Sequence, residues 1–146
     1  MLYVGLDLSR KRLDWQALLP SGERHAIGAV APDANGLEKL VGKLGDAEIL
    51  AAIESMSGAR FVHDQLERRG WEVKIADAVK VKGLAPLACK TDKIDSGVLA
   101  ELARRELVPE IWLPDPEVRA ERERARFRLH LVKHRSALKN RVHAIL

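Results

Sequence analysis

The chain has 146 residues, of which 47% are hydrophobic, 32% charged and only 4% aromatic. This size and composition suit one compact domain with its own core, and they exclude two large domains. Cys89 is the only cysteine, so no disulfide can form within the chain, and the sequence contains neither a signal peptide nor an apolar run of transmembrane length. We therefore expect a cytoplasmic protein that does not engage a membrane.

The charge is unevenly distributed. Residues 117–146 carry nine Lys or Arg and three Glu, whereas residues 1–116 carry 16 basic and 18 acidic side chains. A basic tail on a nearly neutral body suits contact with nucleic acid or an acidic partner, because neutralised phosphates release their counterions. The same pattern also occurs in helices that are merely solvated, so charge alone leaves both interpretations open.

The first 30 residues predict three strands. Apolar and other residues alternate over residues 2–8, 13–19 and 24–30, and Pro20, Ser21 and Gly22 form a turn signal between the second and third runs. In the first run, Leu6 and Leu8 point to one face and Asp7 to the other. Because the connections are short, we expect an antiparallel meander.

The apolar period then changes to that of a helix over residues 37–44, which Gly45 ends. The continuous apolar run over residues 49–53 predicts a strand that is buried on both faces. Ser57 can cap a second helix that ends at Gly70, and alternation resumes over residues 71–75 as a fifth strand. A third helix, capped by Thr91, follows a loop rich in small residues.

The predicted fold class is α/β, with a mixed five-stranded sheet in the order β-β-β-α-β-α-β-α, followed by a long C-terminal helix. We expect a domain over residues 1–108, a proline-rich linker over 109–116 and a basic helix over 117–146. This last segment has no Gly or Pro, and Leu131, Leu138 and Ile145 recur every seven residues. It suits the start of a coiled coil or a helix packed back on its own domain.

Four acidic residues occupy positions where a surface role explains them poorly. Asp7 lies in the predicted central strand, where an unpaired buried carboxylate is costly. Glu54 follows the apolar run 49–53, at the strand end where α/β sheets form ligand sites. Asp92 and Asp95 are three residues apart, so on a helix they share a face. Taken singly, Asp92 also suits an ordinary acid in a first helical turn, and Glu54 a partner of a lysine.

Taken together, the four acids predict a metal site. Clustered carboxylates repel one another, and a hard divalent cation with oxygen ligands, Mg²⁺ or Mn²⁺, is the usual reason to assemble them. Two such ions about 4 Å apart can activate a water or hydroxyl and stabilise the leaving oxygen when a phosphodiester is cleaved. The pattern therefore favours phosphoryl-transfer chemistry.

Other candidate residues carry weaker signals. His130 and His134 have the spacing of a metal-binding pair, but no carboxylate or cysteine stands nearby at ligand spacing. Asp14 is either exposed to solvent or a neighbour of the acidic site. Lys90 and Lys93 flank Asp92 and suit either a phosphate contact or a solvated helix start. The candidate nucleic-acid-binding residues are Lys90, Lys93, Arg122, Arg126, Lys133, Arg135, Lys139 and Arg141.

Three segments carry a family resemblance. They are Gly5-Leu6-Asp7-Leu8-Ser9, Ile53-Glu54-Ser55 and Lys90-Thr91-Asp92-Lys93-Ile94-Asp95. In order and spacing they resemble the N-terminal domain of DEDD-type insertion-sequence transposases, the family named after insertion sequence one-ten and related to Piv-type DNA invertases. The third segment is the most specific of the three.

The resemblance implies a RuvC-like, ribonuclease-H-like domain in which Asp7, Glu54, Asp92 and Asp95 are the catalytic acids and hold Mg²⁺ or Mn²⁺. It also implies site-specific DNA recombination, a structured guide RNA as partner, and a homodimer or higher oligomer formed through the C-terminal helix. Members of the family continue into a coiled coil and a second domain with a catalytic serine. We therefore expect residues 1–146 to be the front part of a larger recombinase.

Two other interpretations stay open. The chain could be a nucleic-acid-binding and dimerisation module whose acids are not catalytic in isolation, or a stand-alone RuvC-like junction endonuclease. Binding of Mn²⁺ and cleavage of branched DNA would separate these interpretations from the first.

Overall fold

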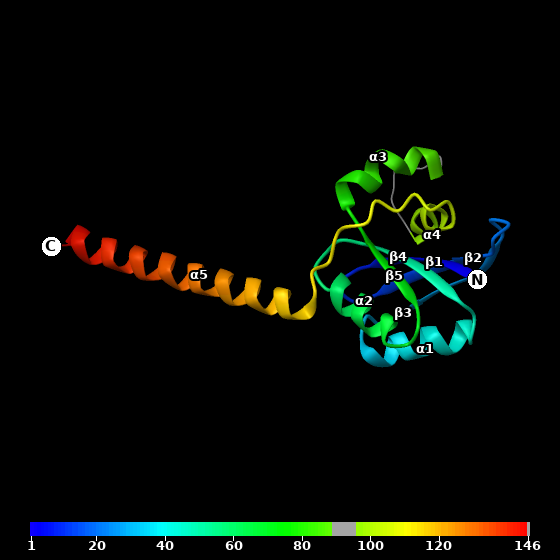
Figure 1. The fold of residues 1–146 in the computed structure, drawn as a ribbon, viewed down its shortest axis with the longest axis horizontal. Coiled ribbons are helices and arrows are strands. Elements are labelled where there is room, and N and C mark those ends of the chain that lie inside the picture. Colours follow the sequence, from blue (N-terminus) through cyan, green and yellow to red (C-terminus); the bar gives the residue numbers. More distant parts are fainter. Residues whose placement is uncertain (89–95, 146) are drawn as a thin grey trace. The chain divides into compact units, whose positions relative to one another are not determined.

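A computed structural model describes residues 1–88 and 96–145, without the side chains of residues 85–88. Five strands form one mixed sheet in the order β3-β2-β1-β4-β5 (Figure 1). Strands β1, β2 and β3 form the predicted antiparallel meander, while β4 pairs in parallel with β1, and β5 with β4. The strands are β1 (Leu2–Leu8), β2 (Leu13–Leu18), β3 (Arg24–Val30), β4 (Ile49–Glu54) and β5 (Glu72–Ala76).

Helices cover both faces of this sheet (Figure 1). On one face lie α1 (Ala34–Leu44) and α2 (Ala59–Glu67), and on the other α3 (Ala78–Ala88) and α4 (Ser96–Arg104). The long helix α5 (Pro116–Ile145) follows. This α/β arrangement confirms the predicted fold class and is compatible with a ribonuclease-H-like fold. The chain divides into two compact units, Met1–Ile111 and Trp112–Leu146.

Two local expectations were wrong. The segment expected to be a loop rich in small residues contains α3, whose first turn is capped by Asp77: its carboxylate accepts hydrogen bonds from the amides of Val79 and Lys80, at 2.9 and 3.2 Å. The expected cap of α2, Ser57, is not its N-cap. That position is Gly58, whose φ of 92° lies in the left-handed region, and no side chain caps this helix.

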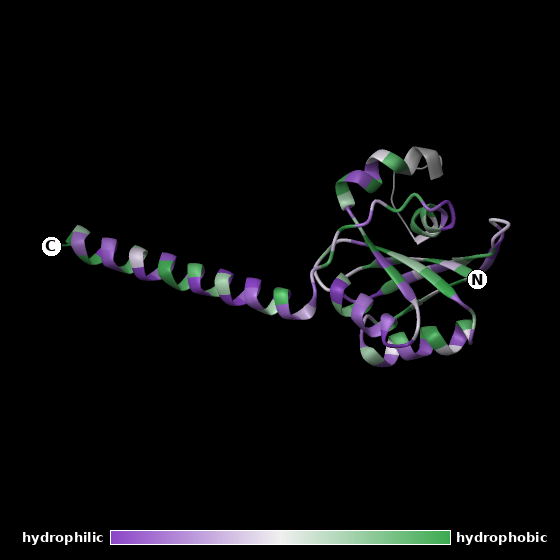
Figure 2. Ribbon diagram, viewed as in Figure 1, coloured by the Kyte–Doolittle hydropathy of each residue, from purple (hydrophilic) through white to green (hydrophobic). Residues whose placement is uncertain are grey.

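The two faces of the sheet are packed differently. Large apolar side chains such as Leu6, Trp15 and Ile53 fill the face beneath α1 and α2, and all three are at most 2% exposed. The other face presents small residues, Gly5 and Ala52, to α4, which packs Leu99 and Leu102 against it. Figure 2 shows hydrophobic, green segments along the strands of the sheet, and alternating green and purple bands along the helices. The small residues let a helix backbone come very close to the sheet.

Gly5 sets the position of α4. A Cβ atom at this residue would lie 1.8 Å from the carbonyl oxygen of Ser96 and 2.4 Å from the amide nitrogen of Ala100. At the other end of the helix, Arg104 Nη1 donates to the carbonyl oxygen of Pro20 at 3.3 Å, in the turn that precedes β3. Helix α4 therefore runs antiparallel to β1, with its first residues toward the carboxyl end of that strand.

Ion pairs hold the far end of α4. Glu101 accepts hydrogen bonds from Arg104 Nε at 2.8 Å and Nη2 at 2.7 Å, and it also pairs with Arg105. The hydrogen bond from Arg104 is the main reason that the pKa of Glu101 lies below its usual value. Because Arg104 also bonds Pro20, the cluster ties the end of α4 to the meander.

Candidate active site

Asp7 and Glu54 end two neighbouring parallel strands. The register pairs Leu6 of β1 with Ile53 of β4, and its continuation by one residue places Asp7 beside Glu54. Side chains alternate along a strand, so Asp7 shares the face of Gly5, and Glu54 that of Ala52. That is the face covered by α4, and both acids are partly buried. Two carboxylates thus lie on adjacent strands, about 4.8 Å apart at the backbone, at the carboxyl edge of the sheet.

The first residues of α4 lie on the same face of the sheet. Ser96 packs over Gly5, two residues before Asp7 on the same strand, and α4 points its first turn toward the carboxyl end of β1. Ser96 is 7% exposed. In the sequence it directly follows Asp95. Asp92 and Asp95, with Lys90, Lys93 and the helix cap expected at Thr91, lie outside the described residues.

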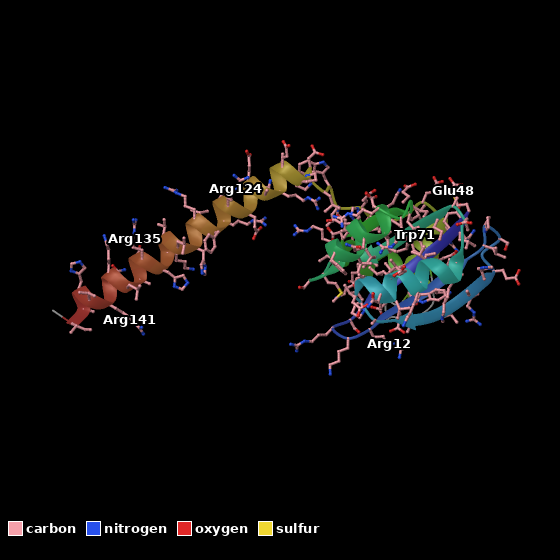
Figure 3. The ribbon with its side chains drawn as sticks, turned by 90° about the horizontal axis from the view of Figure 1, so that it is seen from below. Arg12, Glu48, Trp71, Arg124, Arg135 and Arg141 are labelled. Atoms are coloured by element: carbon pink, nitrogen blue, oxygen red, sulfur yellow. The ribbon has the colours of Figure 1, made fainter. Side chains whose placement is uncertain are left out.

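A third carboxylate, Asp14, stands directly across from Asp7 in the antiparallel pair of β1 and β2. Like charges in such positions destabilise a sheet unless one is compensated. Arg12 compensates Asp14: its Nε donates to Asp14 Oδ1 at 2.8 Å, and its Nη2 lies 2.7 Å from the same oxygen. Arg12 is on the connection between β1 and β2, whose long side chains extend into solvent (Figure 3). The role of Arg12 was missed from the sequence.

Hydrogen bonds to β5 and α3 fix the backbone that directly follows Glu54. The amide of Ser55 donates to the carbonyl oxygen of Ala76 at 2.8 Å, and the hydroxyl of Ser55 accepts from the amide of Ala78 at 3.3 Å. Asp77 also stands at this edge of the sheet, but its carboxylate caps α3. Asp77 therefore has a structural role as the cap of a helix. An acid directly before the first turn of a helix is typical of this role.

The sequence carries the signature of a known protein family. The family model for DEDD transposases of the IS110 type, described as a transposase, matches residues 4–146. The chain belongs to this family. A comparison with curated proteins finds no match. Membership indicates a DNA transposase or recombinase, and so a protein that binds DNA.

Members of the DEDD family generally depend on a divalent metal ion. Within the described part of the chain, no three side chains of His, Cys, Asp or Glu gather as a metal centre. The in-register pair Asp7 and Glu54 nevertheless fits Mg²⁺, which is commonly held by one or two carboxylates together with waters and phosphate oxygens. Asp14 is held by Arg12, which explains why it does not add to the pair.

The C-terminal helix of this transposase chain carries both basic and apolar side chains. No residue of α5 is buried, and its exposed apolar side chains include Phe127, Leu131 and Leu138. Green and purple bands alternate along this helix (Figure 2). Arg124, Arg135 and Arg141 extend from it into solvent (Figure 3). Of these three, Arg135 and Arg141 are predicted nucleic-acid-binding residues. The other predicted residues on this helix are exposed as well: Arg122, Arg126, Lys133 and Lys139.

Some of these side chains contact other residues of α5 or of the segment just before it. The guanidinium of Arg122 lies 5.3 Å from the ring centroid of Trp112, and Arg126 Nη1 is 3.5 Å from Glu123 Oε2. The rings of His130 and His134 meet edge to face at 4.3 Å. None of the described helices is long and apolar enough to cross a membrane.

Proposed function

We propose that Asp7, Glu54, Asp92 and Asp95 form a four-carboxylate site that holds Mg²⁺ or Mn²⁺ and cleaves a DNA phosphodiester during transposition. One observation carries the proposal: Asp7 and Glu54 stand in register on one face of the sheet, at the edge toward which α4 directs its first turn. Asp95 immediately precedes that turn in the sequence, and Asp92 is three residues earlier.

The protein's own residues orient the site. The ladder of β1 and β4 fixes the spacing of Asp7 and Glu54, and the hydrogen bonds of Ser55 fix the chain after Glu54. Gly5 lets the start of α4 approach the two acids, while Arg104 anchors the end of that helix. When bound, the metal ions supply a Lewis acid that activates a water or hydroxyl and stabilises the leaving oxygen.

The basic helix α5 is proposed to contact nucleic acid, including a structured guide RNA, and to pair two subunits through its apolar residues. Its exposed arginines and lysines suit phosphate contacts. Leu131 and Leu138 are seven residues apart and are 52% and 63% exposed, as the seam of an unpaired coiled-coil helix would be.

The exposed α5 also supports a second candidate function, a nucleic-acid-binding and dimerisation module whose acids are not catalytic in isolation. A stand-alone junction endonuclease is the third. Cleavage of a four-way junction by the 146-residue chain would favour the endonuclease. DNA binding without cleavage, together with absence of Mn²⁺ binding, would favour the module.

The test of the main proposal is metal-dependent DNA strand cleavage by the transposase carrying Asp7→Asn. We expect a loss of at least about 100-fold, because the change removes a charged ligand while keeping the side-chain shape. Glu48→Gln is the matched control: Glu48 is exposed and precedes the opposite end of β4 (Figure 3). An Asp7→Asn variant that cleaves at the wild-type rate would contradict the proposal.

A further inference from the structure

A hollow lies beside the acidic edge, on the other side of the sheet. Its volume is about 440 Å³, within the range of small-ligand sites. It is formed by the turn after β1, the segment before α1, and the first turns of α2. The lining residues are Leu8, Ser9, Arg10, Pro32, Met56, Ser57, Gly58, Phe61 and Val62.

Two large apolar side chains of this hollow are exposed to solvent. Met56 is 45% and Phe61 43% exposed, although the neighbouring Val62 is 1% exposed and belongs to the core. The buried stripe of α2 is formed by Ala59, Val62 and Leu66, so Phe61 lies outside it. Phe61 is therefore not explained by packing in the core, and its ring is available to a ligand in the hollow.

The rim of the hollow is basic. Arg10 lines it, and none of the described lining residues is an acid. Lys11 follows Arg10 and is exposed, whereas Arg12 is paired with Asp14. A shallower depression next to it is lined by Arg60 and by Asp64, whose Oδ1 lies 2.9 Å from His63 Nδ1. An apolar, aromatic floor with a cationic rim is complementary to a nucleotide, which has a flat base and an anionic phosphate.

Residues that line the hollow follow closely in the sequence on the two acids of the proposed cleavage site. Leu8 directly follows Asp7, and Met56 is two residues beyond Glu54, a distance of about 7 Å along an extended chain. A DNA strand with a phosphodiester at Asp7 and Glu54 would therefore have a nucleotide next to the hollow. Gly58 belongs to the wall of the hollow, with a φ of 92° in the left-handed region that favours glycine.

We propose that this hollow binds an unpaired base of the DNA strand, one or two nucleotides from the bond to be cut, with Phe61 stacking on the base and Arg10 contacting the phosphate. The inference rests on the proposed action on DNA and adds a site for the base to the site for the phosphodiester. Extruded bases are commonly held between aromatic and apolar side chains in this way.

The test compares three fluorescein-labelled 12-mers by anisotropy in EDTA, with the 146-residue chain: dT12, an abasic deoxyribose-phosphate strand, and rU12. We expect dT12 to bind about tenfold more tightly than the abasic strand. Phe61→Leu should abolish this preference, and Phe61→Tyr should keep it. Arg10→Ala should weaken both DNA strands equally and lower the salt slope by about one.

Matched controls lie elsewhere on the domain. Ile27→Ala removes another exposed apolar side chain, 59% exposed on β3, and Arg24→Ala another exposed arginine; neither should change base preference. Equal binding of dT12 and the abasic strand by the wild-type chain, or an unchanged preference in Phe61→Leu, would overturn the proposal. So would a Phe61-dependent preference for rU12 over dT12, or dimerisation that Phe61→Leu abolishes.

The measurement in EDTA separates this proposal from the metal site. Asp7→Asn should retain the base preference even though it loses cleavage. If cleavage proves independent of Asp7 while the preference persists, the proposed function fails and the base pocket stands. If the preference is absent while Asp7→Asn abolishes cleavage, the pocket fails and the metal site stands.

Discussion

Replacing Gly5 with alanine should displace α4 from the sheet. The new Cβ atom would lie 1.8 Å from Ser96 O and 2.4 Å from Ala100 N, both backbone atoms that cannot rotate away. To increase the distance between the new Cβ atom and Ser96 O from 1.8 Å to 3.0 Å, the helix has to move by about 1.2 Å. Overpacking of this kind costs about 3 kcal/mol in the free energy of unfolding.

Urea unfolding measures this cost. Trp15 and Trp71 are 2% and 5% exposed, so their fluorescence reports on the core. A loss of about 3 kcal/mol should lower the urea midpoint by about 1 to 2 M. The control is Gly42→Ala in α1, where nothing lies within 4 Å of the new Cβ atom and helix propensity should raise stability by up to about 1 kcal/mol.

The same substitution links packing to activity. Moving the start of α4 by about 1 Å relative to Asp7 and Glu54 should lower the rate of DNA cleavage by about 100-fold in protein that is still folded. If Gly5→Ala and Gly42→Ala unfold at the same urea midpoint, the reasoning that close backbone approach positions α4 is refuted. Wild-type cleavage in a clearly destabilised variant would refute the link between that helix and the site.

Two further predictions concern charge. Glu101→Gln should lower the free energy of unfolding by about 1 kcal/mol or less at pH 7. The pKa of Glu101 is depressed in the folded chain, so its contribution is present above its ordinary value of 4.5 and fades as the pH falls below that value; urea titrations at pH 7 and pH 3.5 should show the difference shrink. On α5, Arg135→Ala should weaken binding of a mixed-sequence DNA duplex and lower the salt slope by about one, whereas Asn140→Ala should change neither. An unchanged slope would remove Arg135 from the DNA-binding surface.

Much of the fold could be predicted because its strands alternate or run apolar without interruption. Leu6 and Leu8 face one side of β1 and Asp7 the other, so the sequence alone places a carboxylate at a sheet face. The continuous run before Glu54 likewise indicates a strand covered on both faces, which the burial of residues 49–53 confirms. Both predictions rest on local patterns of the sequence, alternation in β1 and an uninterrupted apolar run in β4, which can be recognised without knowing any tertiary contact.

Helix α3 could not be predicted in the same way, because it has no apolar stripe. Within its described side chains only Val81 is fully buried, while Val79 is 79% exposed. The pairing of Arg12 with Asp14 was missed as well, although the two residues are only two apart, because the like charge that it offsets, Asp7, comes to face Asp14 only in the folded sheet. The hollow at Phe61 also depends on three segments far apart in the chain, so neither its volume nor its basic rim follows from local sequence.

The central claim, a metal site built on Asp7 and Glu54, is tested most directly by calorimetric titration of Mn²⁺ into the 146-residue chain in the presence of DNA. The account predicts a binding isotherm for the wild-type chain and for Glu48→Gln, and its loss in both Asp7→Asn and Glu54→Gln, with all four chains equally folded by circular dichroism. Absence of Mn²⁺ binding by the wild-type chain, or isotherms in the Asp7 and Glu54 variants that match the wild type, would contradict it.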